Sequence, residues 1–75
     1  MYFADAAEHV LRENGGPLSV ADITRRALDQ GLINPRSDHS VTYVRAAIRK
    51  DSRRRESRNE PARFKQVSPG IYTLS

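Results

Sequence analysis

Hydrophobic residues near the start of the chain recur with a helical period. Phe3, Ala6, Ala7, Val10 and Leu11 follow the i, i+3, i+4, i+7, i+8 spacing of one helix face. Residues 14–17, Asn-Gly-Gly-Pro, then supply the signals that end a helix. The pattern predicts a first helix that begins near Phe3 and ends at this segment.

A second helix is predicted from a start signal around Ser19. Ser19 can cap the helix, Asp22 follows three residues later, and Leu18 and Ile23 can pack as a hydrophobic staple. The helix should end at Gly31, which readily takes the left-handed conformation found after a helix end. Its buried face is expected to hold Val20, Ile23, Ala27 and Leu28.

A third helix is predicted after the turn at residues 34–35, where Pro35 cannot continue a helix. Asp38 or Ser40 is the expected cap, and the helix is expected to fray near Arg53. Its buried stripe should consist of Val41, Val44, Ala47 and Ile48.

Two short strands are predicted at the end of the chain, over residues 63–67 and 71–74, joined by the turn Ser68-Pro69-Gly70. Residues 17–18 can add a minor strand between the first two helices. Three helices followed by a C-terminal β-hairpin predict an α+β fold of the winged helix-turn-helix type, with residues 1–75 as a single domain. In such a fold the third helix can enter the major groove of DNA while the hairpin or a neighbouring loop contacts the flanking backbone.

Length and composition favour a binding module over an enzyme. A chain of 75 residues supports one small core and leaves little space for a buried reaction chamber. It has no cysteine, and its two histidines, His9 and His39, do not make a metal site, so we expect no metal and no other cofactor. No apolar run reaches the about 20 residues of a membrane span. We expect an intracellular protein, in the cytoplasm with the nucleoid if bacterial and in the nucleus if eukaryotic.

The positive charge is concentrated in one segment. The chain carries a net charge of +4 with a pI of about 10.1. Residues 45–65 hold nine basic and three acidic residues, a net of +6, and the remainder therefore carries −2. One basic end is typical of a domain that presents a face to phosphate. Of the 13 basic residues all but Lys50 and Lys65 are arginine, which suits phosphate and guanine but also follows from a GC-rich genome.

The solvent side of the third helix combines small residues with cations. At 100° per residue, Thr42, Ala46, Arg49, Lys50 and Arg53 lie opposite the buried stripe. Small residues let a helix approach the bases, and arginine can reach guanine or phosphate. A merely solvated helix usually mixes both charges, and this stripe contains no acid. The expected major-groove residues are Thr42, Tyr43, Arg45, Ala46, Arg49, Lys50 and Arg53.

A basic loop over residues 53–65 is expected to surround the groove and neutralise phosphates. The expected phosphate contacts are Ser40, Arg54, Arg55, Arg58, Arg63 and Lys65. Tyr43 can stack on a base or pack at the edge of the buried stripe, whereas Tyr72 is expected in the core. Residues 37–40, Ser-Asp-His-Ser, have the residue types of a hydrolytic triad, but neighbours on one turn cannot adopt its geometry.

Three stretches of the chain carry a resemblance to a known family: FADAAEHVLRENGGPLSVADITRRALDQGLINPRS, VRAAIRKDSRR and RFKQVSPGIYTLS. Over nearly its whole length, the chain resembles the HARE-type helix-turn-helix domain. This winged-helix family occurs in additional-sex-combs-like chromatin proteins, chromatin remodellers, restriction endonucleases and the RNA polymerase delta subunit. The resemblance implies a DNA-reading or regulatory module, attached to an enzyme or a chromatin assembly, and some members are linked to modified bases. It also implies that Thr42, Arg45, Arg49, Lys50 and Arg53 lie on or beside the DNA-facing helix.

Two functions therefore remain open. The first is a non-enzymatic module that binds double-stranded DNA, the N-terminal reader of a larger restriction or other DNA-processing protein, with a nuclease or other effector fused or associated. It would place a helix of about residues 40–53 in the major groove, and would bind neither a membrane nor a small-molecule substrate. The alternative is a domain that docks on an acidic protein of transcription or chromatin. It would need an apolar anchor within the basic face, and only Ala46 and Tyr43 suggest one.

Overall fold

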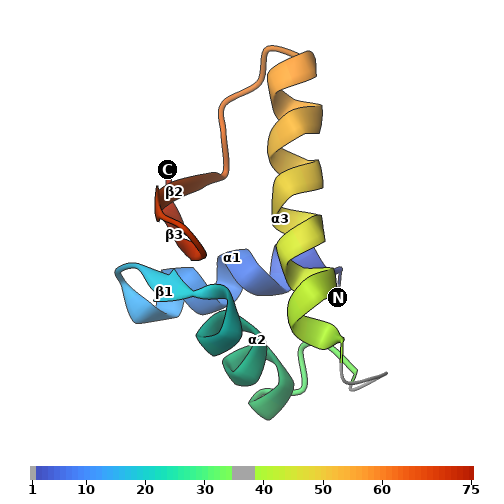
Figure 1. Cartoon of the computed structure of the whole chain (residues 1–75), viewed down its shortest axis with the longest axis vertical. Helices are drawn as coiled ribbons and strands as arrows, with labels where there is room; N and C mark the ends of the chain where they lie inside the picture. The colour runs from blue at the N-terminus through green and yellow to red at the C-terminus, as the bar shows by residue number, and fades with distance from the viewer. Residues whose placement is uncertain (1, 35–38) are drawn as a thin grey trace.

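The predicted α+β winged helix-turn-helix is confirmed by a computed structural model, which describes residues 2–34 and 39–75 (Figure 1). The elements are α1 (Phe3–Asn14), β1 (Leu18–Ser19), α2 (Val20–Asp29), α3 (Ser40–Ser57), β2 (Phe64–Ser68) and β3 (Ile71–Leu74). The turn at Pro35 and the candidate cap Asp38 lie outside the described residues.

The start and end signals of the second helix act as predicted. The side-chain oxygen of Ser19 accepts a hydrogen bond of 3.1 Å from the backbone N–H of Asp22, which caps α2. At the other end of α2, Gly31 has a φ of 70°, and the N–H of Leu32 donates to the carbonyl of Ala27 at 2.9 Å. This is the Schellman arrangement that satisfies the last carbonyls of a helix.

The three strands form one antiparallel sheet in the order β1-β3-β2. The minor strand predicted over residues 17–18 is present one residue later as β1, whose Leu18 pairs with Tyr72 of β3. The hairpin of β2 and β3 is the wing, and its register shifts between Gln66 and Ser68, which leaves Val67 as an extra residue. The turn of the wing includes Gly70 at a φ of 74°, a conformation that favours glycine.

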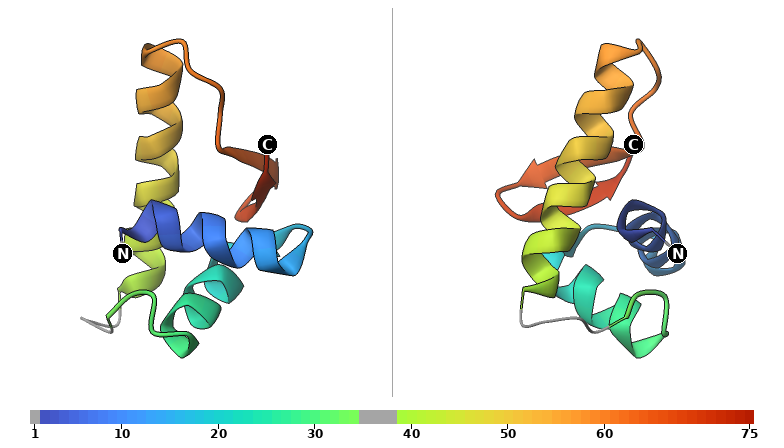
Figure 2. Two further views of the ribbon diagram at one scale, coloured as in Figure 1. Left: turned by 180° about the vertical axis from the view of Figure 1, so that it is seen from behind. Right: turned by 90° about the vertical axis from the view of Figure 1, so that its right-hand side faces the viewer.

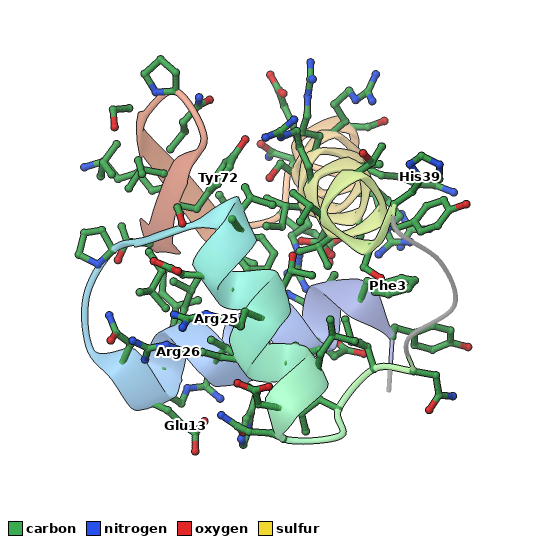
Figure 3. All side chains as sticks on the ribbon, turned by 60° about the horizontal axis from the view of Figure 1, so that its bottom comes forward. Phe3, Glu13, Arg25, Arg26, His39 and Tyr72 are labelled. Atoms are coloured by element: carbon green, nitrogen blue, oxygen red, sulfur yellow. The ribbon has the colours of Figure 1, made fainter. Side chains whose placement is uncertain are left out.

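A single core joins the helices to the sheet. It contains Ala6, Ala7, Val10, Leu11, Val20, Ile23, Ala27, Ile33, Val44, Ile48, Phe64 and Tyr72. Tyr72, predicted as a core residue, lies between the wing and the helices (Figure 3). Because α1, α2, α3 and both wing strands contribute, the core fixes the position of the wing relative to α3.

The predicted end of the third helix is wrong. Instead of fraying near Arg53, α3 continues to Ser57, and its upper half extends past α1 and α2 (Figures 1 and 2). No glycine or proline interrupts α3. After the helix, Asn59 is the first residue in the left-handed conformation, with a φ of 58°. The N–H of Glu60 then donates to the carbonyl of Arg55 at 2.8 Å, which closes the helix end. Arg54 and Arg55 are therefore helical residues and not part of a loop.

The buried face of α3 is more polar than predicted. Val44 and Ile48 are buried as expected, and Val41 and Ala47 are half-buried. Ser40 and Asp51 are also buried, because they lie on the same side of the helix. Ser40 is the first residue of α3, and the cap position belongs to His39.

Candidate nucleic-acid interface

The outer face of α3 has the composition predicted for it. Thr42, Ala46, Arg49, Lys50 and Arg53 are all exposed. The helix spans 18 residues, which corresponds to about 27 Å at 1.5 Å per residue. Its cations, from Arg45 to Arg55, extend over about 15 Å of this length, a little under half of one turn of duplex DNA, about 34 Å.

A groove of about 600 Å³ lies between α3 and the wing. One wall is formed by α3 and the other by the wing, with core residues at the base. The residues that line it are Arg45, Ile48, Arg49, Ser52, Arg53, Phe64, Gln66, Pro69, Gly70 and Tyr72. We call this the α3–wing groove.

The charge of the α3–wing groove is entirely positive. Arg45, Arg49 and Arg53 repeat every four residues along its α3 wall, and no acidic residue is among those that line it. Within residues 2–34 and 39–75, none of these three guanidinium groups forms an ion pair. Three uncompensated cations on one wall create a positive potential that attracts a polyanion.

A different group of arginines surrounds a buried carboxylate on α3. Asp51 is 2% exposed. One of its oxygens accepts a hydrogen bond of 3.1 Å from Nε of Arg55, and the other accepts one of 3.3 Å from Arg54. Arg63 lies 3.6 Å from the same carboxylate. A buried charge is costly unless it is paired and hydrogen-bonded, and these three arginines provide that compensation.

Arg63 connects α1 to α3 at the root of the wing. Besides Asp51, its guanidinium donates to Asp5 of α1 at 2.9 Å and lies 3.7 Å from Glu8. Its side chain is only 16% exposed. Arg63 directly precedes β2, so these contacts bind the start of the wing to two helices. A guanidinium with three carboxylate neighbours is much less accessible to a phosphate than Arg53 is.

The expected site residues thus fall into separate groups. Arg45, Arg49 and Arg53 share the groove, with Thr42 and Ala46 exposed beside them on α3. Tyr43 and Lys50 face the opposite flank, towards the start of α1. Ser40 is buried, Arg54, Arg55 and Arg63 pair with Asp51, and Arg58 and Lys65 are exposed at the end of α3 and on β2.

Two features of the interface were missed from the sequence. The burial of Asp51 was missed, although its position in phase with Val44 and Ile48 could have indicated it. The contribution of Gln66, Pro69 and Gly70 to the groove was also missed. That contribution depends on how the wing folds back towards α3, and no local pattern encodes it.

No group of three or more histidine and acidic side chains that could hold a metal ion occurs among the described residues. In the same part of the chain, no helix is long and apolar enough to cross a membrane. The groove presents arginines and hydroxyl and amide groups, which suits recognition of phosphate and base edges.

Three helices, a wing beside the third of them and a basic groove between the two define a winged helix-turn-helix domain. The chain belongs to the HARE-HTH family, because the model of that family, whose description names ASXL and restriction endonuclease HTH domains, matches residues 1–75. The family comprises DNA-binding domains and not catalytic ones. Comparisons with curated proteins and with solved structures give no match.

Proposed function

We propose that the chain binds double-stranded DNA through the α3–wing groove and the exposed residues beside it on α3, Thr42 and Ala46. The observation that carries the proposal is the row of Arg45, Arg49 and Arg53, which are unpaired among the described residues and lie in a groove lined by no acid. Membership of a DNA-binding family supports it. Phosphate neutralisation by such cations supplies most of the affinity of nonspecific DNA binding.

The geometry supports a division of roles on α3. Thr42 and Ala46 are small, so the first half of the helix can approach base edges in the major groove. Arg49 and Arg53 follow along the helix and can reach guanine or phosphate, while Arg58 and Lys65 are exposed to flanking phosphates. Arg54, Arg55 and Arg63 support the fold in this proposal, because Asp51 engages them.

The alternative, docking of an acidic protein at this same groove, has less support. Both aromatic residues of the groove, Phe64 and Tyr72, are buried in the core. The groove therefore lacks the exposed apolar anchor that protein interfaces need at their centre. The same burial leaves no exposed ring in the groove to stack on a flipped base.

We further propose that the domain is the N-terminal module of a larger DNA-processing protein and delivers an effector domain to DNA. The family description, which includes restriction endonucleases, supports this role. The small size of the domain also supports it, because 75 residues provide a binding surface and little room for a reaction site. In a bacterium the domain would act at the nucleoid, and in a eukaryote in the nucleus.

Fluorescence anisotropy with three matched duplexes, unmodified, cytosine-methylated and adenine-methylated, tests the proposal. Contact with about four to six phosphates gives a slope of log affinity against log salt of about −3.6 to −5.4. Equal binding to all three duplexes would indicate that the domain contacts the phosphate backbone and does not recognise the modifications. A difference in affinity would indicate a reader of base modification. The absence of measurable affinity for any of the duplexes, even at low salt, would refute DNA binding.

A further inference from the structure

A second groove, of about 510 Å³, lies on the other flank of α3, between that helix and the start of α1. Ala47, Lys50 and Arg54 line it from α3, and Tyr2, Phe3 and Ala4 line it from the beginning of the chain. We call it the α1–α3 groove. It shares none of its lining residues with the α3–wing groove, so ligands could occupy both at once.

Aromatic side chains are exposed in and next to the α1–α3 groove: Tyr2 is one of its lining residues, and Tyr43 lies beside it against Phe3. Tyr2 is 84% exposed and Tyr43 is 47% exposed, and these are two of the three large hydrophobic residues exposed in the described ranges. The ring of Tyr43 stacks on that of Phe3, with centroids 6.2 Å apart and an angle of 27° between the planes. Figure 3 shows Phe3 beside the start of α3. A stacked ring is held in place before a ligand arrives, which lowers the entropy cost of binding.

The charge that lines the groove is net positive, with three cations against two acids. Asp5 is 47% exposed and hydrogen-bonded to Arg63, and Asp51 is buried among its arginines. Lys50 is exposed and forms no ion pair within the described part of the chain, and the side chain of Arg54 is more than half exposed. Tyr43, Ala47, Lys50 and Arg54 follow one another at helical spacing, so an apolar pair is followed by a basic pair along one edge of α3.

We propose that the α1–α3 groove binds an acidic segment of a partner protein that carries an aromatic or aliphatic anchor. The anchor would pack on Tyr2, Tyr43 and Ala47, and carboxylates next to it would pair with Lys50 and Arg54. Exposed aromatic residues next to cations are the groups that dominate binding energy at protein interfaces. The complementary charge selects an acidic partner over a basic one. The domain would thereby join an acidic protein to DNA bound on the opposite flank of the same helix.

The test uses a synthetic peptide of about 12 residues with one central phenylalanine among aspartates and glutamates. Two control peptides replace the phenylalanine by serine or the acids by lysines. Each is titrated into the ¹⁵N-labelled protein without DNA, and amide shifts are followed by NMR. Binding of the first peptide should shift Tyr43, Ala47 and Lys50, and both control peptides should bind at least about fivefold more weakly. Because no DNA is present, the outcome is independent of the function proposed above.

Three variants locate the contact. Tyr2→Ala and Tyr43→Ala should each weaken the acidic peptide about fivefold or more, whereas Arg49→Ala, on the opposite flank, should leave its affinity within about twofold. Tyr2→Ala retains the ring stack of Phe3 and Tyr43, so a loss of binding in that variant cannot come from loss of the stack. Absence of binding, equal binding of the serine peptide, or shifts centred on Arg45, Arg49 and Arg53 would each overturn the proposal.

Discussion

At the scale of single residues, the carboxylate of Asp51 separates the arginines into two groups. Arg54, Arg55 and Arg63 surround it, and Arg45, Arg49 and Arg53 point away from it into the α3–wing groove. The sequence shows only one basic stretch, because it does not reveal which cations have an internal partner. The buried acid therefore determines how many of these positive charges remain available to DNA.

Removal of the buried carboxylate should destabilise the fold. We expect Asp51→Ala to lower the free energy of unfolding by about 3 kcal/mol, since it leaves Arg55 and Arg63 partly buried with one counter-charge fewer. Glu56→Ala, an exposed change on the same helix, should stay within about 0.5 kcal/mol of the wild type. Urea unfolding measures both. Equal stability of the two variants would show that the Asp51 contacts do not stabilise the fold.

Arg63 and Arg53 should respond differently to salt. We expect Arg53→Gln to reduce the slope of log DNA affinity against log salt by about 0.9, the effect of one lost phosphate contact. Arg63→Gln should lower stability but leave the slope unchanged, because its guanidinium is bound to carboxylates of α1 and α3. Anisotropy titrations at several salt concentrations separate the two effects. A slope reduced equally by Arg63→Gln would place that side chain on the DNA.

At the scale of elements, the length of α3 decides where the basic residues lie. The helix continues to Ser57 and closes through Asn59. Asn59→Ala should lower the free energy of unfolding by about 1 kcal/mol, because a side chain with a Cβ and no local hydrogen bond disfavours a positive φ. Asn59→Gly should be neutral or slightly stabilising. Thermal unfolding distinguishes the two variants, and an Asn59→Ala protein as stable as Asn59→Gly would show that α3 ends elsewhere.

The elements that the sequence predicted well are those with local signals. Ser19 followed by Asp22, Gly31 after an apolar stripe, and the Pro69-Gly70 turn each act within a few residues, so they could be read directly. The extent of α3 could not, because its last turns are stabilised in part by Asp51, whose burial depends on Arg63 and on α1. The outer face of α3 was predictable from its period. The wall that the wing contributes to the groove was not.

At the scale of the whole molecule, the positive charge lies on the side formed by α3 and the wing. The net charge of +6 over residues 45–65 is carried by α3, the wing and the connection between them, and the −2 of the remainder lies on α1, whereas α2 is neutral. A molecule with this asymmetry should approach DNA with α3 first, and association should be faster at low salt. Stopped-flow mixing with a labelled duplex tests this expectation. An association rate that does not depend on salt would contradict it.

The most direct test compares two variants that lose the same charge from different faces. Arg49→Ala/Arg53→Ala removes two of the three arginines from the α3 wall of the groove, and Arg12→Ala/Arg26→Ala removes two cations from α1 and α2. In anisotropy titrations with one duplex, we expect the first variant to bind at least about tenfold more weakly with a salt slope smaller by about 1.8, and the second to bind within about threefold of the wild type. Equal losses in both variants, or an unchanged affinity in the first, would contradict DNA binding by the α3–wing groove.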